Sequence, residues 1–122
     1  MKEASRAALS GSRGEDVAER LLLGLGYRVL ARNFRTRSGE IDIVAEDVDT
    51  IVFVEVKRRE STTHGRPEEF ISSAKIRRVI SAARIYAARY GLTERKIRFD
   101  VIAVEPRDGG DHARHFKSAF TT

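Results

Sequence analysis

Two apolar runs separated by a short polar turn constrain the fold of this chain most strongly. Residues 40–46 and 51–58 each carry the β-branched and aromatic side chains typical of strands. Asp47 to Thr50 lie between them, and a turn there, with a two-residue or a four-residue loop, makes the numbers of opposed residues sum to 97. The sequence therefore predicts an antiparallel β-hairpin with a fixed register.

Charged side chains inside this hairpin need an explanation, because ionised groups are rarely buried unless they are paired or bound to a metal. The register places Asp42 opposite Glu55, with Cβ atoms about 4.5–5.5 Å apart, where like charges repel. Lys57 shares the strand face of Glu55, and Glu40 is its simplest cross-strand partner. A divalent cation between the carboxylates would remove the repulsion, whereas a degenerate site or a surface ion-pair ladder is the alternative.

Apolar periodicity and capping patterns predict the remaining elements. Ser12 and Glu15 match a capping box, which indicates a helix over residues 13–25. A second helix is expected to start at Pro67 or Ser72 and to end at Gly91. Strands are expected at residues 27–34 and 97–105, with a short final strand at 112–116.

This order of elements predicts an α/β fold with a mixed sheet flanked by helices. Three strands are antiparallel, and the helix before the fourth strand allows that strand to run parallel to a hairpin strand. We expect a single domain at residues 12–105, preceded by a flexible segment at 1–11 and followed by a C-terminal tail at 106–122.

Composition limits the class of protein and its partners. The 122 residues carry a formal net charge of +5 and a sequence pI near 10.0, which favours a polyanionic partner such as nucleic acid. The chain contains no cysteine, which excludes a disulfide framework or a thiolate metal site and fits the cytoplasm. We expect no signal peptide, no membrane-spanning segment and no membrane partner.

Basic residues near the hairpin exit and the second helix are candidates for phosphate contacts. Arg58 and Arg59 follow the lysine strand, and Lys75 and Arg78 lie early in the helix. A track of phosphate-binding side chains and an ordinary solvated face explain them equally well. His112 and His115 lack accompanying zinc ligands, so we expect no metal there.

Several motifs together resemble one known family. They are Gly14-Glu15-Asp16-Val17-Ala18 with Gly26-Tyr27, the run from Gly39 to Ala45, the run from Val52 to Arg58, and the run from Arg98 to Val104. In these motifs the chain is similar to the YraN-like family of small bacterial proteins. That family is itself similar to archaeal Holliday-junction resolvases and to the restriction-endonuclease-like superfamily. The resemblance implies a core of helix, three antiparallel strands, helix and strand.

The resemblance also implies roles for individual residues. Asp42 and Glu55 would be ligands of Mg²⁺ or Mn²⁺, with the main-chain carbonyl of Val56 as a further ligand. Lys57 would be the catalytic lysine, and Glu15 on the first helix would complete the acidic set. Oxygen ligands of this kind suit Mg²⁺, which keeps several waters.

The leading hypothesis is a metal-dependent endonuclease that hydrolyses DNA phosphodiester bonds, with branched or structured DNA as one substrate class. Resolvases act as symmetric dimers, so the resemblance also implies a homodimer. The alternative is a non-catalytic nucleic-acid-binding module with the same restriction-endonuclease-like fold. A third hypothesis is an adaptor that recruits another enzyme through an exposed apolar patch.

Overall fold

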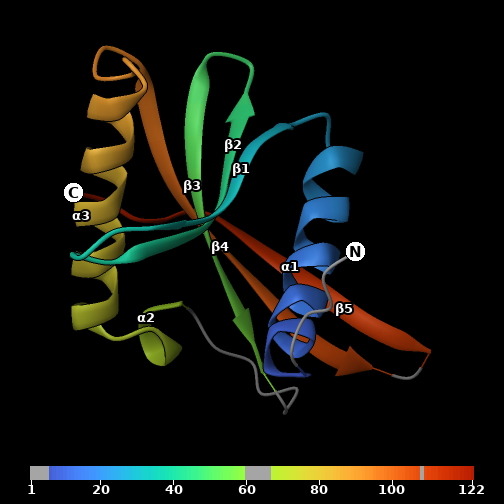
Figure 1. Cartoon of the computed structure of the whole chain (residues 1–122). Coiled ribbons are helices and arrows are strands. Elements are labelled where there is room, and N and C mark those ends of the chain that lie inside the picture. Colours follow the sequence, from blue (N-terminus) through green and yellow to red (C-terminus); the bar gives the residue numbers. More distant parts are fainter. Residues whose placement is uncertain (1–5, 60–66, 108) are drawn as a thin grey trace.

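The computed structural model describes residues 6–59, 67–107 and 109–122, without the side chains of residues 6–12, 67 and 68. Its elements are α1 (Arg6–Gly24), β1 (Arg28–Arg35), β2 (Glu40–Asp47), β3 (Thr50–Arg58), α2 (Pro67–Phe70), α3 (Ser73–Arg89), β4 (Lys96–Arg107) and β5 (Gly110–Phe120) (Figure 1). No helix in the described part of the chain is long and apolar enough to span a bilayer.

A five-stranded mixed sheet, ordered β1-β2-β3-β4-β5, forms the centre of the molecule. Strands β1, β2 and β3 pair antiparallel, as do β4 and β5. Strand β4 runs parallel to β3, and the connection between them contains α3. The predicted antiparallel hairpin and the parallel fourth strand are both confirmed.

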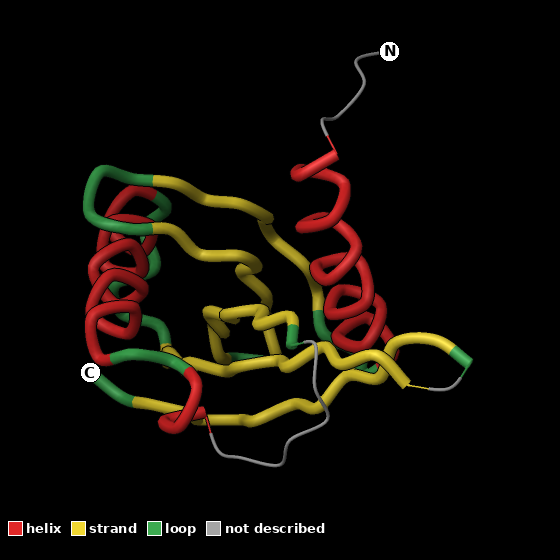
Figure 2. Tube along the Cα trace, turned by 90° about the horizontal axis from the view of Figure 1, so that it is seen from below, coloured by secondary structure: helices red, strands yellow, loops and turns green. Residues whose placement is uncertain are grey.

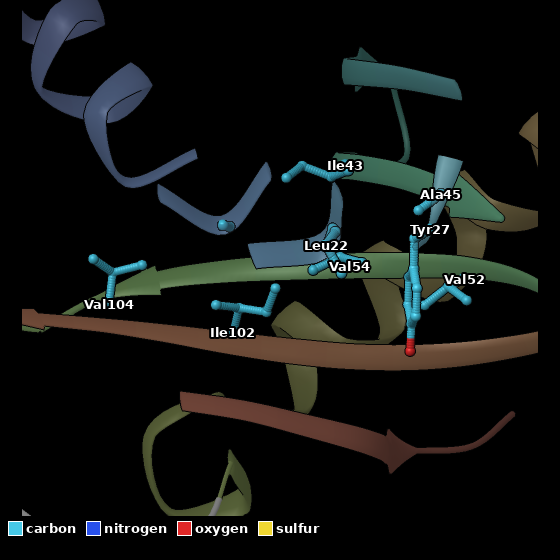
Figure 3. Close-up of a cluster of buried hydrophobic side chains, with 9 residues drawn as sticks. Leu22, Tyr27, Ile43, Ala45, Val52, Val54, Ile102 and Val104 are labelled. Atoms are coloured by element: carbon cyan, nitrogen blue, oxygen red, sulfur yellow. The ribbon is translucent and has the colours of Figure 1, made fainter. Parts of the chain in front are cut away.

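The two long helices cover opposite faces of the sheet (Figures 1 and 2). Val52 and Val54 pack in the cluster that includes residues of α1, whereas Phe53 packs in the cluster that includes residues of α3. Figure 3 shows the first cluster, in which Leu22 of α1 lies close to Val54 of β3. The alternation of side chains along β3 therefore builds one apolar core on each face of the sheet.

The start of the first helix differs from the prediction. Helix α1 begins at Arg6, so Ser12 lies inside the helix and cannot be the first residue of a capping box. The pattern was misleading because Ala7, Ala8 and Leu9 are themselves good helix formers and extend the helix towards the N-terminus. Residues 6–11, which were expected to be flexible, are helical.

Two other predictions are sharpened by the structure. Both expected helix starts are used: Pro67 begins the short helix α2, and Ser72 caps α3 by accepting the Lys75 N–H at 3.1 Å. Strand β5 runs from Gly110 to Phe120 and is longer than the expected strand at 112–116. The C-terminal residues thus form an edge strand paired with β4. The sequence also indicates a loop from Arg59 to Pro67 that contains His64, and residues 60–66 of this loop lie outside the described residues.

The turn between β1 and β2 contacts α3 through Gly39. A Cβ atom at Gly39 would collide with the main-chain carbonyl oxygen of Arg78 and lie 2.8 Å from the Arg78 Cβ. Only glycine lets the two backbones approach this closely. The close contact holds the start of β2, and with it Asp42, against the N-terminal half of α3.

Candidate metal centre

The hairpin register brings Asp42 and Glu55 together. Ladder pairs from Asp47–Thr50 to Ile43–Val54 all sum to 97, which confirms the predicted register. Beyond Ile43 a side chain replaces the main-chain pairing, because Asp42 Oδ2 accepts the Val56 N–H at 2.7 Å. Asp42 is 8% exposed and Glu55 is 6% exposed, so two carboxyl groups interact inside the protein.

Burial and mutual repulsion make this pair hard to ionise fully. Burial, followed by the negative charge of Asp42, raises the pKa of Glu55 to about 8, while the charge of Lys75 opposes the shift. Burial also raises the pKa of Asp42, although the hydrogen bond from the Val56 N–H favours its charged form. The pair therefore retains one proton at a pH where isolated carboxyl groups have lost theirs.

Both carboxylates open into a cavity of about 600 Å³ at the ends of β2 and β3, next to α2 and the start of α3. Its lining also contains two lysines, one from the strand and one from the helix. Lys57 of β3 is exposed and makes no ion pair within the described ranges. Lys75 of α3 lies with its Nζ 3.5 Å from Glu55 Oε2. The structure thus places Asp42, Glu55, Val56 and Lys57 around one cavity.

The donor set fits a divalent cation that prefers oxygen. Glu55 Oε1 is buried and has no hydrogen-bond partner among the described residues, so an acceptor atom is left without a donor or an ion. The described side chains offer no group of three His, Cys, Asp or Glu residues that could hold a metal. Two carboxylates and a main-chain carbonyl suit Mg²⁺, which completes its octahedron with water, better than zinc.

Glu15 does not join the two acids. Its carboxylate accepts hydrogen bonds from Arg32 at 3.2 Å and from Asn33 at 3.0 Å, and it does not line the cavity. Arg32 also binds Asp16 and Glu19, so it holds three acids of α1 against β1. The expected completion of the acidic set by Glu15 is therefore not met, because a nearby arginine satisfies this carboxylate instead.

The four predicted phosphate contacts lie in different surroundings. Arg58 lines the cavity and lies 3.7 Å from Asp111, and Lys75 faces Glu55. Arg78 is exposed on α3. The side chain of Arg59 is only 13% exposed: it stacks on Phe70 and lies 3.8 Å from the buried Glu105. Arg59 therefore contacts the protein interior rather than forming part of an exposed basic track.

Sequence comparison identifies the relatives of this chain. Residues 14–104 match the profile of the uncharacterised protein family UPF0102. The chain belongs to the UPF0102 family. It is 44% identical over 112 residues to a family member from Persephonella marina, an alignment that covers 92% of this chain and 93% of the relative.

Two further members of the UPF0102 family show the same extent of similarity. One, from Anaeromyxobacter dehalogenans, is 46% identical over 90% of this chain and 82% of the relative. Another, from Symbiobacterium thermophilum, is 46% identical over 90% of this chain and 94% of the relative. The resemblance to the YraN-like family is thereby confirmed.

Lys75 is the residue whose placement sequence reasoning missed. It was expected to contact phosphate, yet it faces the carboxylates. One signal could have indicated this, since Lys75 lies in the first turn of α3, where the helix dipole disfavours a cation. A lysine at that position calls for a nearby negative charge, and Glu55 supplies it.

Proposed function

We propose that this UPF0102 protein is a Mg²⁺- or Mn²⁺-dependent nuclease that hydrolyses DNA phosphodiester bonds. The observation that carries the proposal is the buried Asp42–Glu55 pair, whose Glu55 Oε1 has no hydrogen-bond partner among the described residues. Lys57 lines the same cavity without an ion-pair partner in the described part of the chain. Such a combination is unfavourable for folding alone and suits metal-assisted hydrolysis.

Each residue has a distinct chemical task in this proposal. Asp42 and Glu55 would hold the ion, with the Val56 carbonyl as a third protein ligand. The bound ion would supply positive charge beside the phosphate and lower the pKa of a coordinated water. Lys57, which is exposed and unpaired in the described structure, would orient that water and stabilise the negative charge that develops on the phosphate.

The order of elements and the charge of the chain support DNA as the substrate. Helix, three antiparallel strands, helix and a parallel strand agree with the order implied by the restriction-endonuclease-like resemblance. The formal net charge of +5 favours association with a polyanion. A homodimer remains an expectation of the resemblance, and sedimentation of the purified protein would measure it.

Cleavage of a panel of DNA forms tests the proposal. Duplex, single-stranded, flap and four-way DNA are incubated with the protein and Mg²⁺ or Mn²⁺, and Glu55→Gln and Lys57→Ala are run in parallel. We expect Lys57→Ala to lower the cleavage rate by about 100-fold or more while most DNA affinity remains. Lys117→Ala, which removes an exposed lysine of β5, is the matched control and should cut normally.

The same assay distinguishes the enzyme from a binding module. A nuclease cuts at least one DNA form and loses cleavage in Asp42→Asn and Glu55→Gln. If no form is cut, and these substitutions and Lys57→Ala leave binding and stability unaltered, the nuclease proposal is wrong. The chain would then be a non-catalytic nucleic-acid-binding module.

A further inference from the structure

The two lysines of the cavity differ in what they contact. Lys75 Nζ lies 3.5 Å from Glu55 Oε2, and its side chain is 30% exposed. Lys57 is exposed and has no ion-pair partner in the part of the chain that the structure describes. The cation that neutralises the buried acids therefore comes from α3 and not from the strand that carries Glu55.

The contact between Lys75 and Glu55 is loose. Charge-assisted hydrogen bonds between ammonium and carboxylate groups are typically about 2.7–2.9 Å long, which is clearly shorter than this separation. The second oxygen of Glu55, Oε1, has no hydrogen-bond partner among the described residues. Lys75 thus offsets the charge of the pair from a distance and leaves one Glu55 oxygen without a partner among the described residues, so a better ligand would displace it.

The position of Lys75 in its helix also favours displacement. Lys75 lies in the first turn of α3, whose N-terminal dipole repels cations, and that turn contains no acidic residue. The backbone there is fixed independently of the side chain, because Ser72 Oγ accepts the Lys75 N–H. The lysine side chain can therefore leave Glu55 while the helix stays in place.

We propose that Lys75 is a built-in competitor for the divalent cation: it occupies the Glu55 carboxylate in the metal-free protein and is released when the ion binds. The inference rests on the proposed metal site and adds its regulation. Release would leave the Lys75 ammonium in the cavity beside the place of the phosphate. Lys75 would then contact substrate only in the metal-loaded protein, which couples DNA binding to the presence of the ion.

Metal affinity measured by calorimetric titration with Mn²⁺, on the full chain without DNA, tests the competition. Lys75→Gln should bind Mn²⁺ about tenfold more tightly than the wild type, because it removes an opposing charge beside a ligand oxygen. Its melting temperature without metal should fall, since the acids lose their nearest cation. Lys57→Gln removes the same charge from the same cavity but breaks no ion pair seen in the described structure. The affinity of this variant for Mn²⁺ should therefore rise much less.

The remaining outcomes separate this inference from the proposed function. Lys75→Arg keeps the cation and should bind Mn²⁺ like the wild type. If Lys75→Gln binds no more tightly than Lys57→Gln, or binds more weakly, the competition is overturned although the metal site stands. If no variant and no wild-type protein binds Mn²⁺, the metal site itself is wrong, and the competition falls with it.

Discussion

Asp100 of β4 and the Asp42–Glu55 pair are both acids buried in the sheet, but their partners differ. Asp100 is 0% exposed and accepts hydrogen bonds from Arg98 at 2.9 and 3.0 Å and from the Ser118 N–H at 3.0 Å. His115 Nε2 lies 2.7 Å from its second oxygen. The pair at the cavity has one main-chain donor, one loosely held lysine and one oxygen without a hydrogen-bond partner in the described structure.

Because their partners differ, the pKa values of the acids at the two sites shift in opposite directions. Burial acts to raise the pKa of Asp100, but its bonds with His115, Arg98 and the Ser118 N–H outweigh burial and hold its pKa below the ordinary value. Burial prevails at the cavity, and the pKa of Glu55 rises to about 8. A strand acid that the fold satisfies stabilises the protein, whereas one left short of partners is available for a ligand.

The largest effect on stability is expected at Asp100. Asp100→Asn would replace a fully buried carboxylate by a neutral amide and leave Asp47 as the one remaining charged partner that the described structure gives Arg98, so the free energy of unfolding should fall by about 3–5 kcal/mol. Chemical denaturation at pH 7 measures the change. Asp49→Asn, at an exposed aspartate paired with Lys96, is the control and should change stability little. Equal effects at Asp100 and Asp49 would contradict a structural role for Asp100.

A smaller loss of stability is expected when the contact between Gly39 and α3 is disturbed. Gly39→Ala places a methyl group against the Arg78 carbonyl, so the start of β2 must move away from α3 at a cost of about 1–3 kcal/mol. Thermal unfolding would show a lower melting temperature. Gly24→Ala adds the same methyl group where no atom lies within 4 Å, and it should leave stability unchanged or slightly raised. Two equal losses would show that the close contact at Gly39 is unimportant.

Glu55→Gln without metal is expected to change how stability depends on pH. Because the folded pKa of Glu55 lies near 8 and its ordinary value is 4.5, the native state binds more protons than the unfolded state between these values. The stability of the wild type should therefore fall as the pH rises from about 4.5 to 8. Glu55→Gln should flatten this dependence and make the protein more stable than the wild type at pH 8.

The Asp100 group should show the opposite dependence on pH. Its lowered pKa stabilises the protein above the ordinary value of 3.8, and this contribution is lost as the pH falls through the folded pKa. Melting curves of wild type and Glu55→Gln from pH 3 to 9 therefore measure the contribution of Asp100 at low pH and that of Glu55 at higher pH. A wild-type stability that is constant from pH 5 to 8 would show that burial does not raise the pKa values of Asp42 and Glu55.

Local patterns were sufficient to predict much of the fold. Alternation along residues 51–58 fixed the faces of β3, and the polar turn at Asp47 to Thr50 fixed the register of the ladder, which ends at Ile43–Val54 next to Asp42 and Glu55. The start of α1 was not predictable from Ser12 and Glu15, because a capping pattern inside a longer helix looks the same in sequence. Strand β5 was underestimated because its polar residues alternate weakly and its pairing with β4 is tertiary.

The candidate site was predictable only where its residues share the hairpin. Asp42, Glu55 and Lys57 are related by strand geometry, which sequence alone provides. The ion pair of Lys75 with Glu55 depends on how α3 docks on the sheet, and the bond of Glu15 with Arg32 depends on how α1 docks. Such contacts between elements carry no periodic pattern, so residue type and position suggested other roles for both.

Thermal unfolding with and without metal, at constant ionic strength, tests the central claim most directly. A cation that binds only the native state adds RT ln(1 + [L]/Kd), which is about 2.7 kcal/mol at a hundredfold excess over Kd. The wild-type melting temperature should rise in Mg²⁺ or Mn²⁺, and the rise should vanish in Asp42→Asn and in Glu55→Gln. A wild-type curve that does not move across millimolar metal, or a rise of equal size in both variants, would contradict a metal site at Asp42 and Glu55.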